Sequence, residues 1–402
     1  MISVEAALKT VLKNIKTLGP QTVTLTDSLR RVLAENIYSN ADIPSFGNSA
    51  MDGYAVKASD TIGASKRKGK RLRVIEDVKA GSIAKKILKN GQGIRIMTGA
   101  PIPNGADSVI MVEETKRDGD SVEILKEVNP QENIRSAGED IRKGELVIEK
   151  GTLLTSAHIG VLASLGIPAV KATRRPVVAV LATGDELVGV HQKLRPGKLH
   201  SSNTYSLYSQ ILNCGGLPKN LGIAKDKTDE LKAKIKKGLL SCDLLLTSGG
   251  VSVGDYDLVK SVLKDMGTDI KFWQVAMRPG KPLAFGKIKA IPVFGLPGNP
   301  VSSMVSFEVF VRPAILKMLG QGGDCCNEID AVLKEAIFKK NGLKYFLRAV
   351  TRWEEGHYVT RTTGPQGSGI LKSMTLANSL IILPEDIERV EKGEKVKVRF
   401  LK

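Results

Sequence analysis

Cysteine and histidine are scarce in this chain of 402 residues, which contains four of each. Cys214, Cys242 and the adjacent pair Cys325 and Cys326 show no Cys-x-x-Cys spacing, so a structural zinc site is not expected. The scattered positions also argue against a disulfide framework and favour reduced thiols, as in a cytoplasmic protein.

Long apolar runs and aromatic residues are lacking as well. No run approaches the roughly 18 apolar residues of a membrane helix, and Met1–Lys16 has no apolar core of a secretory signal. We therefore expect a cytoplasmic protein with no membrane partner. Aromatic residues make up only 4% of the chain, which leaves few side chains on which nucleic-acid bases could stack.

Acidic residues are outnumbered, with 42 Asp and Glu against 60 Lys and Arg, a formal net charge of +18. Such an excess suits nucleic acid, an acidic membrane surface or an anionic small molecule, and net charge alone does not choose among them. Lys66–Arg73 holds six basic residues in eight positions, which we interpret as a solvated hairpin tip.

The spacing of apolar residues changes along the chain. Three-to-four spacing predicts helices over 3–18 and 27–34, whereas short alternating segments predict a β-rich region from 43 to 154. Apolar strands alternate with helical patterns over 175–319, which predicts a parallel, doubly wound sheet. Short strands over 324–402 predict a small barrel or sandwich.

The predicted elements can be placed more closely. The expected strands are Leu72–Val78, Ile94–Met97, Ser108–Val112, Val122–Val128, Leu146–Ile148, Pro176–Ala182, Asp243–Thr247, Ile291–Phe294, Tyr345–Trp353, His357–Thr363, Leu380–Leu383 and Lys395–Phe400. The expected helices of the α/β region are Ser201–Asn213, Thr228–Leu240, Asp257–Met266 and Pro300–Leu319.

Three glycine-rich loops directly follow strands of the predicted sheet. They are Thr183–Glu186, Ser248–Asp255 and Gly295–Ser303, and they share one edge because the carboxyl ends of parallel strands do. Glycines allow close approach to a ligand, hydroxyls can donate hydrogen bonds, and Asn299 and Pro300 start a helix whose N–H groups suit an anion. Turn geometry would explain one such loop; three at one edge favour a ligand site.

Charged residues flank these loops. Arg278–Pro282 is a stiff basic loop, which is either a solvated turn or a clamp for an oxyanion. The acidic residues among the basic ones would repel a phosphate unless Mg²⁺ bridged them, although each could instead cap a helix. These acidic residues are Asp185, Glu186, Asp226, Asp255 and Asp257.

Motifs in this order resemble those of the molybdopterin molybdenumtransferase family, which includes bacterial MoeA and the E domain of gephyrin. They are Pro44–Phe46 with Ser49–Ala55, Ile96–Pro103, Gly138–Asp140, Thr183–Leu187, Ser248–Asp255, the Pro-Gly-Lys-Pro of the basic loop, and Gly295–Pro300. The resemblance covers nearly the whole chain. It departs from the commonest pattern at Arg278, where lysine is usual.

The resemblance implies an α/β plus β-rich fold, in an elongated multidomain subunit with a doubly wound α/β (molybdopterin-binding) domain, a β-rich inserted domain and a C-terminal small β-barrel. The implied domains are 1–46 with 145–172, 47–144, 173–323 and 324–402. The subunit would form a homodimer with its active site at the subunit interface.

The implied reaction inserts molybdate into adenylylated molybdopterin, with Mg²⁺-dependent cleavage of the phosphoanhydride and release of AMP. A transient contact with the molybdopterin adenylyltransferase is implied too, and no nucleic-acid or membrane partner. Alternatives are a homologue that performs only the adenylylation, one that inserts tungstate, a non-catalytic molybdopterin-binding or scaffold protein, and a nucleic-acid-binding protein that uses the positive charge.

Site residues follow from the same resemblance. The catalytic set is Asp52, Thr98, Asp140, Glu186, Asp226 and Asp257. The substrate-binding set is Thr183, Gly184, Asp185, Ser248, Gly249, Gly250, Ser252, Pro297, Gly298, Asn299 and Pro300. The molybdate-binding set is Arg278, Lys281, Pro282, Ser302, Arg348 and Ser368, and Mg²⁺ would be held by Asp185, Glu186 and Asp257.

Overall fold

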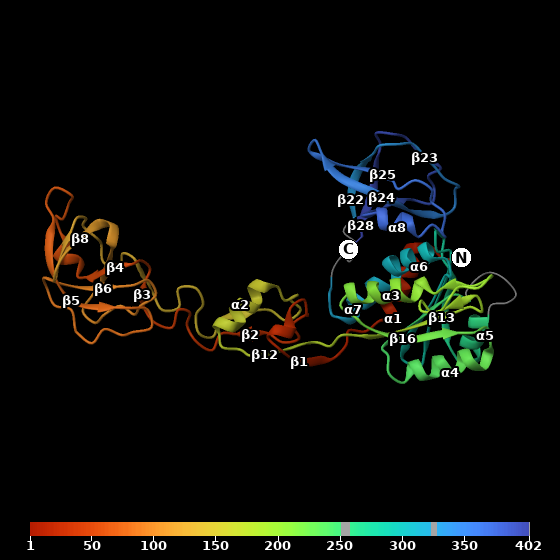
Figure 1. Cartoon of the computed structure of the whole chain (residues 1–402), viewed down its shortest axis with the longest axis horizontal. Coiled ribbons are helices and arrows are strands. Elements are labelled where there is room, and N and C mark those ends of the chain that lie inside the picture. The colour runs from red at the N-terminus through yellow and green to blue at the C-terminus, as the bar shows by residue number, and fades with distance from the viewer. Residues whose placement is uncertain (251–257, 323–327, 402) are drawn as a thin grey trace. The chain divides into compact units, whose positions relative to one another are not determined.

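The computed structural model describes residues 1–250, 258–322 and 328–401. Outside these ranges lie Ser252, Asp255, Asp257, Cys325 and Cys326. The chain forms two compact units (Figure 1). The large unit comprises Met1–Thr22, Arg30–Ala34 and Lys171–Lys402, and the small unit comprises Val23–Leu29 and Glu35–Val170. Within the described ranges, no helix has the length and apolar character needed to cross a membrane.

The small unit is built on a six-stranded sheet in the order β7-β4-β6-β5-β9-β8. Its strands are β4 (Gly53–Val56), β5 (Lys70–Val78), β6 (Gln92–Ile96), β7 (Ser108–Met111), β8 (Thr115–Asp118) and β9 (Ser121–Ile124). The β-rich prediction is confirmed, although the strand expected over 122–128 ends at Ile124. Strand β4 is buried along its length because β7 and β6 flank it, which fixes the loop before it.

Shorter elements complete the small unit. They are η1 (Thr26–Ser28), β2 (Ile37–Tyr38), β3 (Asn48–Ser49), η2 (Ala58–Thr61), η3 (Val112–Glu114), β10 (Ile134–Arg135), β11 (Leu146–Ile148) and α2 (Ser156–Ser164). Strands β1 (Pro20–Thr24) and β12 (Ala169–Thr173) lie where the chain passes between the units. Strand β3 pairs with β10 and β2 with β11, both antiparallel.

The helix predicted over 27–34 is wrong. Only the single turn η1 forms there, and Arg30 then adopts a positive φ of 59° that an α-helix cannot contain. Leu33 forms a β-bridge with Ala172 instead. Pairing with a distant segment therefore overrides the local helical pattern. The helix predicted over 3–18 does form, as α1 (Val4–Asn14).

The α/β part of the large unit contains a six-stranded sheet in the order β16-β13-β17-β21-β20-β18. Its strands are β13 (Val177–Thr183), β16 (Leu217–Ala224), β17 (Leu244–Ser248), β18 (Asp269–Gln274), β20 (Pro282–Ile288) and β21 (Ile291–Leu296), with the small pair β14 (Leu187–Val188) and β15 (Leu199–His200) beside them. Strands β16, β13, β17 and β21 are parallel, as predicted.

The expectation of an entirely parallel sheet is wrong at one edge. Strand β20 runs antiparallel to β21, and β18 runs antiparallel to β20. Only Lys289 and Ala290 separate β20 from β21, and Lys289 has a positive φ of 54°. A connection of two residues makes a hairpin, because a parallel crossover needs a dozen residues or more.

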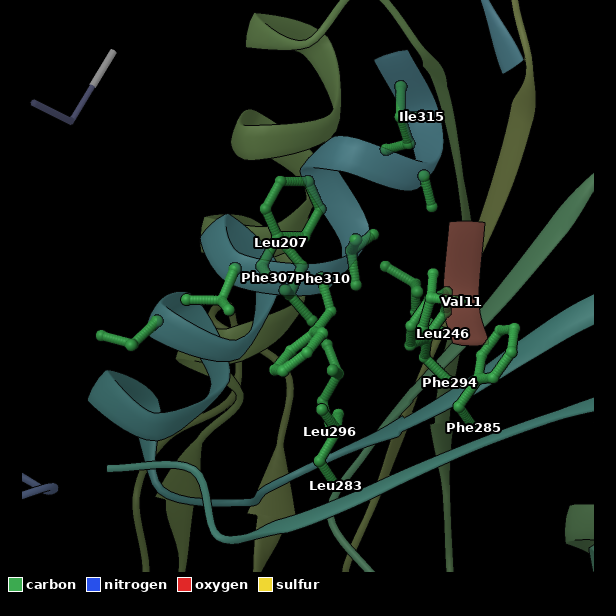
Figure 2. Packing of buried hydrophobic residues seen from close by; sticks show 14 of the residues in the cluster. Val11, Leu207, Leu246, Leu283, Phe285, Phe294, Leu296, Phe307, Phe310 and Ile315 are labelled. Carbon is green, nitrogen blue, oxygen red and sulfur yellow. The ribbon is translucent and has the colours of Figure 1, made fainter. Parts of the chain in front are cut away.

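Helices cover both faces of this sheet, which confirms the doubly wound prediction. Val178 and Val180 of β13 pack in one apolar cluster with α1, α3 (Ser202–Asn213), α6 (Pro300–Ser306) and α7 (Arg312–Met318). The alternate residues Ala179 and Leu181 pack in a second cluster with α4 (Thr228–Leu239) and α5 (Leu258–Asp265). Figure 2 shows the first cluster, in which the rings of Phe285 and Phe294 lie 4.8 Å apart.

The single helix predicted over 300–319 is wrong in its middle. A π-helical turn, η4 (Phe307–Val311), separates α6 from α7. Pro313 follows it, and proline has no N–H and clashes with the carbonyl four residues earlier, so an unbroken α-helix through Val309 is unfavourable. All five residues of the π turn are buried, including the carboxylate-bearing Glu308.

The C-terminal part of the large unit is a closed barrel of five strands. They follow the order β24-β25-β22-β28-β26, and β26 pairs back with β24. The elements are β22 (Glu328–Leu333), β23 (Ile337–Phe338), β24 (Lys344–Glu354), β25 (His357–Thr362), α8 (Lys372–Leu376), β26 (Ser379–Leu383), β27 (Arg389–Val390) and β28 (Lys395–Phe400). Strand β19 (Met277–Arg278) of the α/β part pairs with β24, which joins the barrel to the α/β part.

A substitution at Gly53 tests the pairing of β4 with β7 in the sheet of the small unit. A Cβ at Gly53 would lie 1.8 Å from the carbonyl oxygen of Ile110, so β4 and β7 can pair only with glycine there. We expect Gly53→Ala to lower the free energy of unfolding of the small unit by about 1–3 kcal/mol. Chemical denaturation followed by circular dichroism measures this.

Gly160 is the matched control for that substitution, because it lies in α2 and, apart from its own helix, no atom of the described residues lies within 4 Å of the place that a Cβ would take. Gly160→Ala should raise the free energy of unfolding by about 0.5–1 kcal/mol, since alanine loses less conformational freedom in a helix. Equal effects of the two substitutions would contradict the steric argument.

Candidate functional site

Three loops meet at the carboxyl edge of the sheet. The loop after β17 touches the end of β13, because a Cβ on Gly249 would lie 2.4 Å from the carbonyl oxygen of Thr183. It also bonds to the end of β21, since the Gly249 N–H donates to the Leu296 carbonyl at 3.1 Å, and a Cβ on Gly298 in the loop after β21 would lie 3.7 Å from the Gly249 Cα. Gly249 and Gly250 have φ values of 98° and 65°, so both the backbone and the space require glycine.

Carboxylates gather on the loops after β13 and β16. The Asp185 N–H donates to the Asp226 carboxylate at 3.3 Å, and the Asp226 N–H donates to the Asp185 carboxylate at 3.2 Å. The Glu186 carboxylate lies beside Gly184, where a Cβ would be 2.6 Å from both of its oxygens. Within residues 1–250, 258–322 and 328–401, no three His, Cys, Asp or Glu side chains are grouped closely enough to hold a metal ion.

Asn203, on the first turn of α3, is a site residue that the sequence analysis missed. Its Nδ2 donates to Ser248 Oγ at 2.8 Å and to the Gly298 carbonyl at 2.7 Å, so one amide ties two of the loops together. The side chain is 8% exposed. The one local signal was the run of polar residues that begins the predicted helix at Ser201.

The start of α6, directly after the third loop, contacts the barrel. Asn299 Nδ2 donates to Ser368 Oγ at 3.1 Å, and the Val301 N–H donates to the Ser368 carbonyl at 3.1 Å. One of the free N–H groups that the sequence analysis offered to an anion is therefore occupied by protein. Ser302 is buried in the same turn, with 4% of its surface exposed.

The basic loop lies against the barrel and against α6. The Arg278 guanidinium stands over the Tyr345 ring, 5.5 Å from its centre, and Nη1 donates to the hydroxyl at 3.3 Å. Gly280 has a φ of 101°, and a Cβ there would lie 2.5 Å from Ser306 Oγ. Lys281 is exposed, and Pro282 begins β20.

Arg348 is fully buried in the barrel strand β24. Its Nε donates to Ser373 Oγ at 3.0 Å and its Nη2 to the Gly367 carbonyl at 3.0 Å. Its Nη1 is buried with no hydrogen-bond partner in the described part of the chain. Burial lowers the pKa of the guanidinium to about 10. An arginine buried among neutral groups leaves a positive charge that an anion can neutralise.

Arg278 and Arg348 line one cleft of 740 Å³ between the barrel and the basic loop. The cleft is basic, since its charged lining residues are Arg278, Glu335, Lys339, Lys340 and Arg348. Glu335 accepts hydrogen bonds from the N–H and hydroxyl of Thr362, which partly offset its charge. The cleft therefore suits an anionic ligand. Two of the six residues predicted to bind molybdate, Arg278 and Arg348, line it.

The three predicted residues of the small unit, Asp52, Thr98 and Asp140, lie on three loops, and the first two of these loops are in contact. Asp52, which precedes β4, accepts hydrogen bonds from the Thr98 N–H at 2.7 Å and the Thr98 hydroxyl at 2.8 Å. The pKa of Asp52 is lowered, chiefly by the backbone N–H of Thr98 and then by its hydroxyl. Asp140 is exposed on another loop, whose backbone is held by the carbonyl of Ile43.

Comparisons with known families cover nearly the whole chain. Residues 2–166 match the model of the MoeA N-terminal region (domain I and II), and residues 330–401 match the MoeA C-terminal region (domain IV). Between them, residues 179–317 match a probable molybdopterin binding domain.

Individual relatives and solved structures agree over the full length. The chain is 38% identical to the molybdopterin molybdenumtransferase of Bacillus subtilis, covering 100% of this chain and 94% of the relative, and 36% identical to molybdopterin molybdenumtransferase 2 of Mycobacterium tuberculosis, covering 99% of each. A molybdopterin biosynthesis MoeA protein from Pyrococcus horikoshii superposes with a TM-score of 0.85 at 36% identity, covering 100% of this chain and 99% of that one. The chain therefore belongs to the MoeA family of molybdopterin molybdenumtransferases, which are transferases of molybdenum cofactor biosynthesis.

Proposed function

We propose that this chain inserts molybdate into adenylylated molybdopterin, with cleavage of the phosphoanhydride and release of AMP. The observation that carries the proposal is Arg348, a buried guanidinium that lines a basic cleft and whose Nη1 has no hydrogen-bond partner among the residues that the structure describes. A buried cation without a carboxylate partner is costly unless an anion completes it. Molybdate, a dianion, is the substrate whose charge matches this need.

The oxyanion subsite combines a buried cation and an exposed one. Arg348 is held by Ser373 and by backbone carbonyls, so it presents Nη1 in one direction, whereas Arg278 is exposed and stacked on Tyr345. Lys281, Pro282, Ser302 and Ser368 belong to this subsite by the resemblance. Two guanidinium groups on one cleft would hold a tetrahedral dianion by charge-assisted hydrogen bonds.

The glycine-rich edge would hold the pterin and its phosphates. The loops there are close-packed, so that backbone N–H groups and the Ser248 hydroxyl can approach a ligand without intervening side chains. In the reaction the phosphoanhydride bond breaks by attack of water, which yields AMP and molybdopterin, each keeping its own phosphate. The two dithiolene sulfurs then bind molybdenum in place of one molybdate oxygen, which leaves as a single water molecule with the two sulfur-borne protons.

The carboxylates near this edge fit Mg²⁺ by donor chemistry. Asp185 and Asp226 are exposed and linked through their backbone N–H groups, and Mg²⁺ is commonly held by one or two carboxylates plus substrate phosphates. Glu186 and Asp257 complete the proposed set by resemblance. Bound there, Mg²⁺ would neutralise the charge of the phosphoanhydride that must break.

The small unit would serve the site of a second subunit in a homodimer. Asp52 stays ionised because Thr98 donates two hydrogen bonds to it, so it can orient a water molecule or a metal-bound ligand. Asp140 joins this role by resemblance. A transient contact with the molybdopterin adenylyltransferase would deliver the adenylylated substrate.

Arg348 is tested by Arg348→Gln. Loss of a charge-assisted hydrogen bond should raise the KM for molybdate about tenfold or more, with the KM for adenylylated molybdopterin nearly unchanged. AMP release at varied molybdate concentration measures both constants. Arg352→Gln is the control, because Arg352 lies on the same strand but is exposed and away from the cleft. A folded Arg348→Gln protein with an unaltered molybdate KM contradicts the oxyanion role.

The carboxylates are tested by metal removal and by Asp185→Asn, which keeps the oxygen that accepts the Asp226 N–H. Chelation should abolish AMP release and added Mg²⁺ should restore it. Asp185→Asn should raise the Mg²⁺ concentration for half-maximal rate about tenfold, and Asp229→Asn, on the exposed first turn of α4, should not. A Mg²⁺ response identical in both variants would exclude Asp185 as a ligand.

A further inference from the structure

Asn203 joins two loops that are far apart in the sequence. Both hydrogens of its amide nitrogen are used, one toward Ser248 Oγ at the end of β17 and one toward the Gly298 carbonyl after β21. The residue is buried, so water does not compete for these bonds. An asparagine with both N–H groups committed to neighbouring loops fixes the distance between them.

The bond to Ser248 also fixes the direction in which the Ser248 hydroxyl donates its hydrogen. Because Ser248 Oγ accepts from the amide, its own hydrogen points away from Asn203 and can be donated to another acceptor. A donor is what an anionic ligand needs at this edge. The bond to Gly298 holds the segment just before Asn299 and Pro300, and thereby the start of α6.

We propose that Asn203 is the positioning residue of the ligand-binding edge: it orients the Ser248 hydroxyl as a donor and clamps the Gly298 loop beside it. The identity of the ligand, adenylylated molybdopterin, rests on the proposed function. Asn203 does not touch reacting atoms, so it contributes to substrate affinity and leaves the chemical step unchanged.

The side chain must be an amide. Aspartate has the same shape but would place an oxygen against the Gly298 carbonyl and add a negative charge near the phosphates. Alanine would leave the Gly298 carbonyl without its buried donor, and such groups are costly to leave unpaired. Asn203→Asp and Asn203→Ala should therefore both disturb the loops.

Gln210 provides a matched control on the same helix. It is also 8% exposed, and its amide nitrogen donates to the Met304 carbonyl at 3.3 Å and to Glu308 at 2.8 Å. It lies about two turns further along α3 and faces the body of α6 and the π turn. Gln210→Ala thus removes a similar buried amide without touching the loops.

The first measurement is the dependence of AMP release on adenylylated molybdopterin in the full-length chain. Asn203→Ala and Asn203→Asp should raise the KM for this substrate about tenfold or more with kcat within about twofold, whereas Gln210→Ala should leave the KM within about twofold. An Asn203→Ala protein with unchanged KM, or a Gln210→Ala protein with the same rise, overturns the proposal.

The second measurement needs no ligand. Amide hydrogen exchange of the free protein should accelerate in peptides covering 244–250 and 295–299 for Asn203→Ala, and in peptides covering 304–311 for Gln210→Ala. Unchanged exchange at 244–250 and 295–299 overturns the clamp even if the enzyme is active. If the wild-type chain releases no AMP, the proposed function fails, and the exchange data still decide whether Asn203 clamps the loops.

Discussion

Close contact between backbones at the carboxyl edge of the sheet is the constraint on which the site depends. Gly249 lies against the end of β13 and bonds to the end of β21, and its position leaves no room for a side chain, so the backbones come into direct contact there. Their parallel strands bring the loop starts together, and the glycines let the loops close. The remaining gap is bridged from the side by Asn203, whose helix α3 packs on the same face as α6.

Opposite charges are separated within this framework. The carboxylates Asp185 and Asp226 lie on the loops after β13 and β16, at the β16 side of the sheet, and the two arginines line the cleft near the barrel. A ligand that carries phosphates and meets an oxyanion needs both kinds of charge, one to hold a cation and one to hold anions. Other cations of this chain, with its net charge of +18, do not line the cleft, and Lys66, Lys236 and Lys237 are exposed examples.

Local sequence patterns predicted β13, β17 and β21 and the loops after them, because glycine and hydroxyl residues directly follow these apolar strands. Strands β16, β18 and β20 were not predicted, so the antiparallel edge that β18 and β20 form was missed as well. The π turn could not be predicted from the sequence, because the spacing of apolar residues in a single π turn differs little from that in an α-helix. Pro313 is the one local sign that the α-helix is interrupted. Asn203 escaped notice because its partners lie 45 and 95 positions away.

Arginine at position 278 shows how the site and the barrel are linked. A lysine there would carry the same charge, but a planar guanidinium has five N–H donors, so it can lie over the Tyr345 ring, donate to the Tyr345 hydroxyl and still offer donors to a ligand. Arg278 lies over Tyr345, and the two residues are also paired in the β19–β24 ladder. Arg278 therefore both lines the cleft and helps to attach the barrel to the α/β part. Arg348 lies three positions beyond Tyr345 on the same strand, so the β19–β24 pairing helps to place both cations at the cleft. The contacts of Ser368 with the start of α6 hold the barrel at a second point.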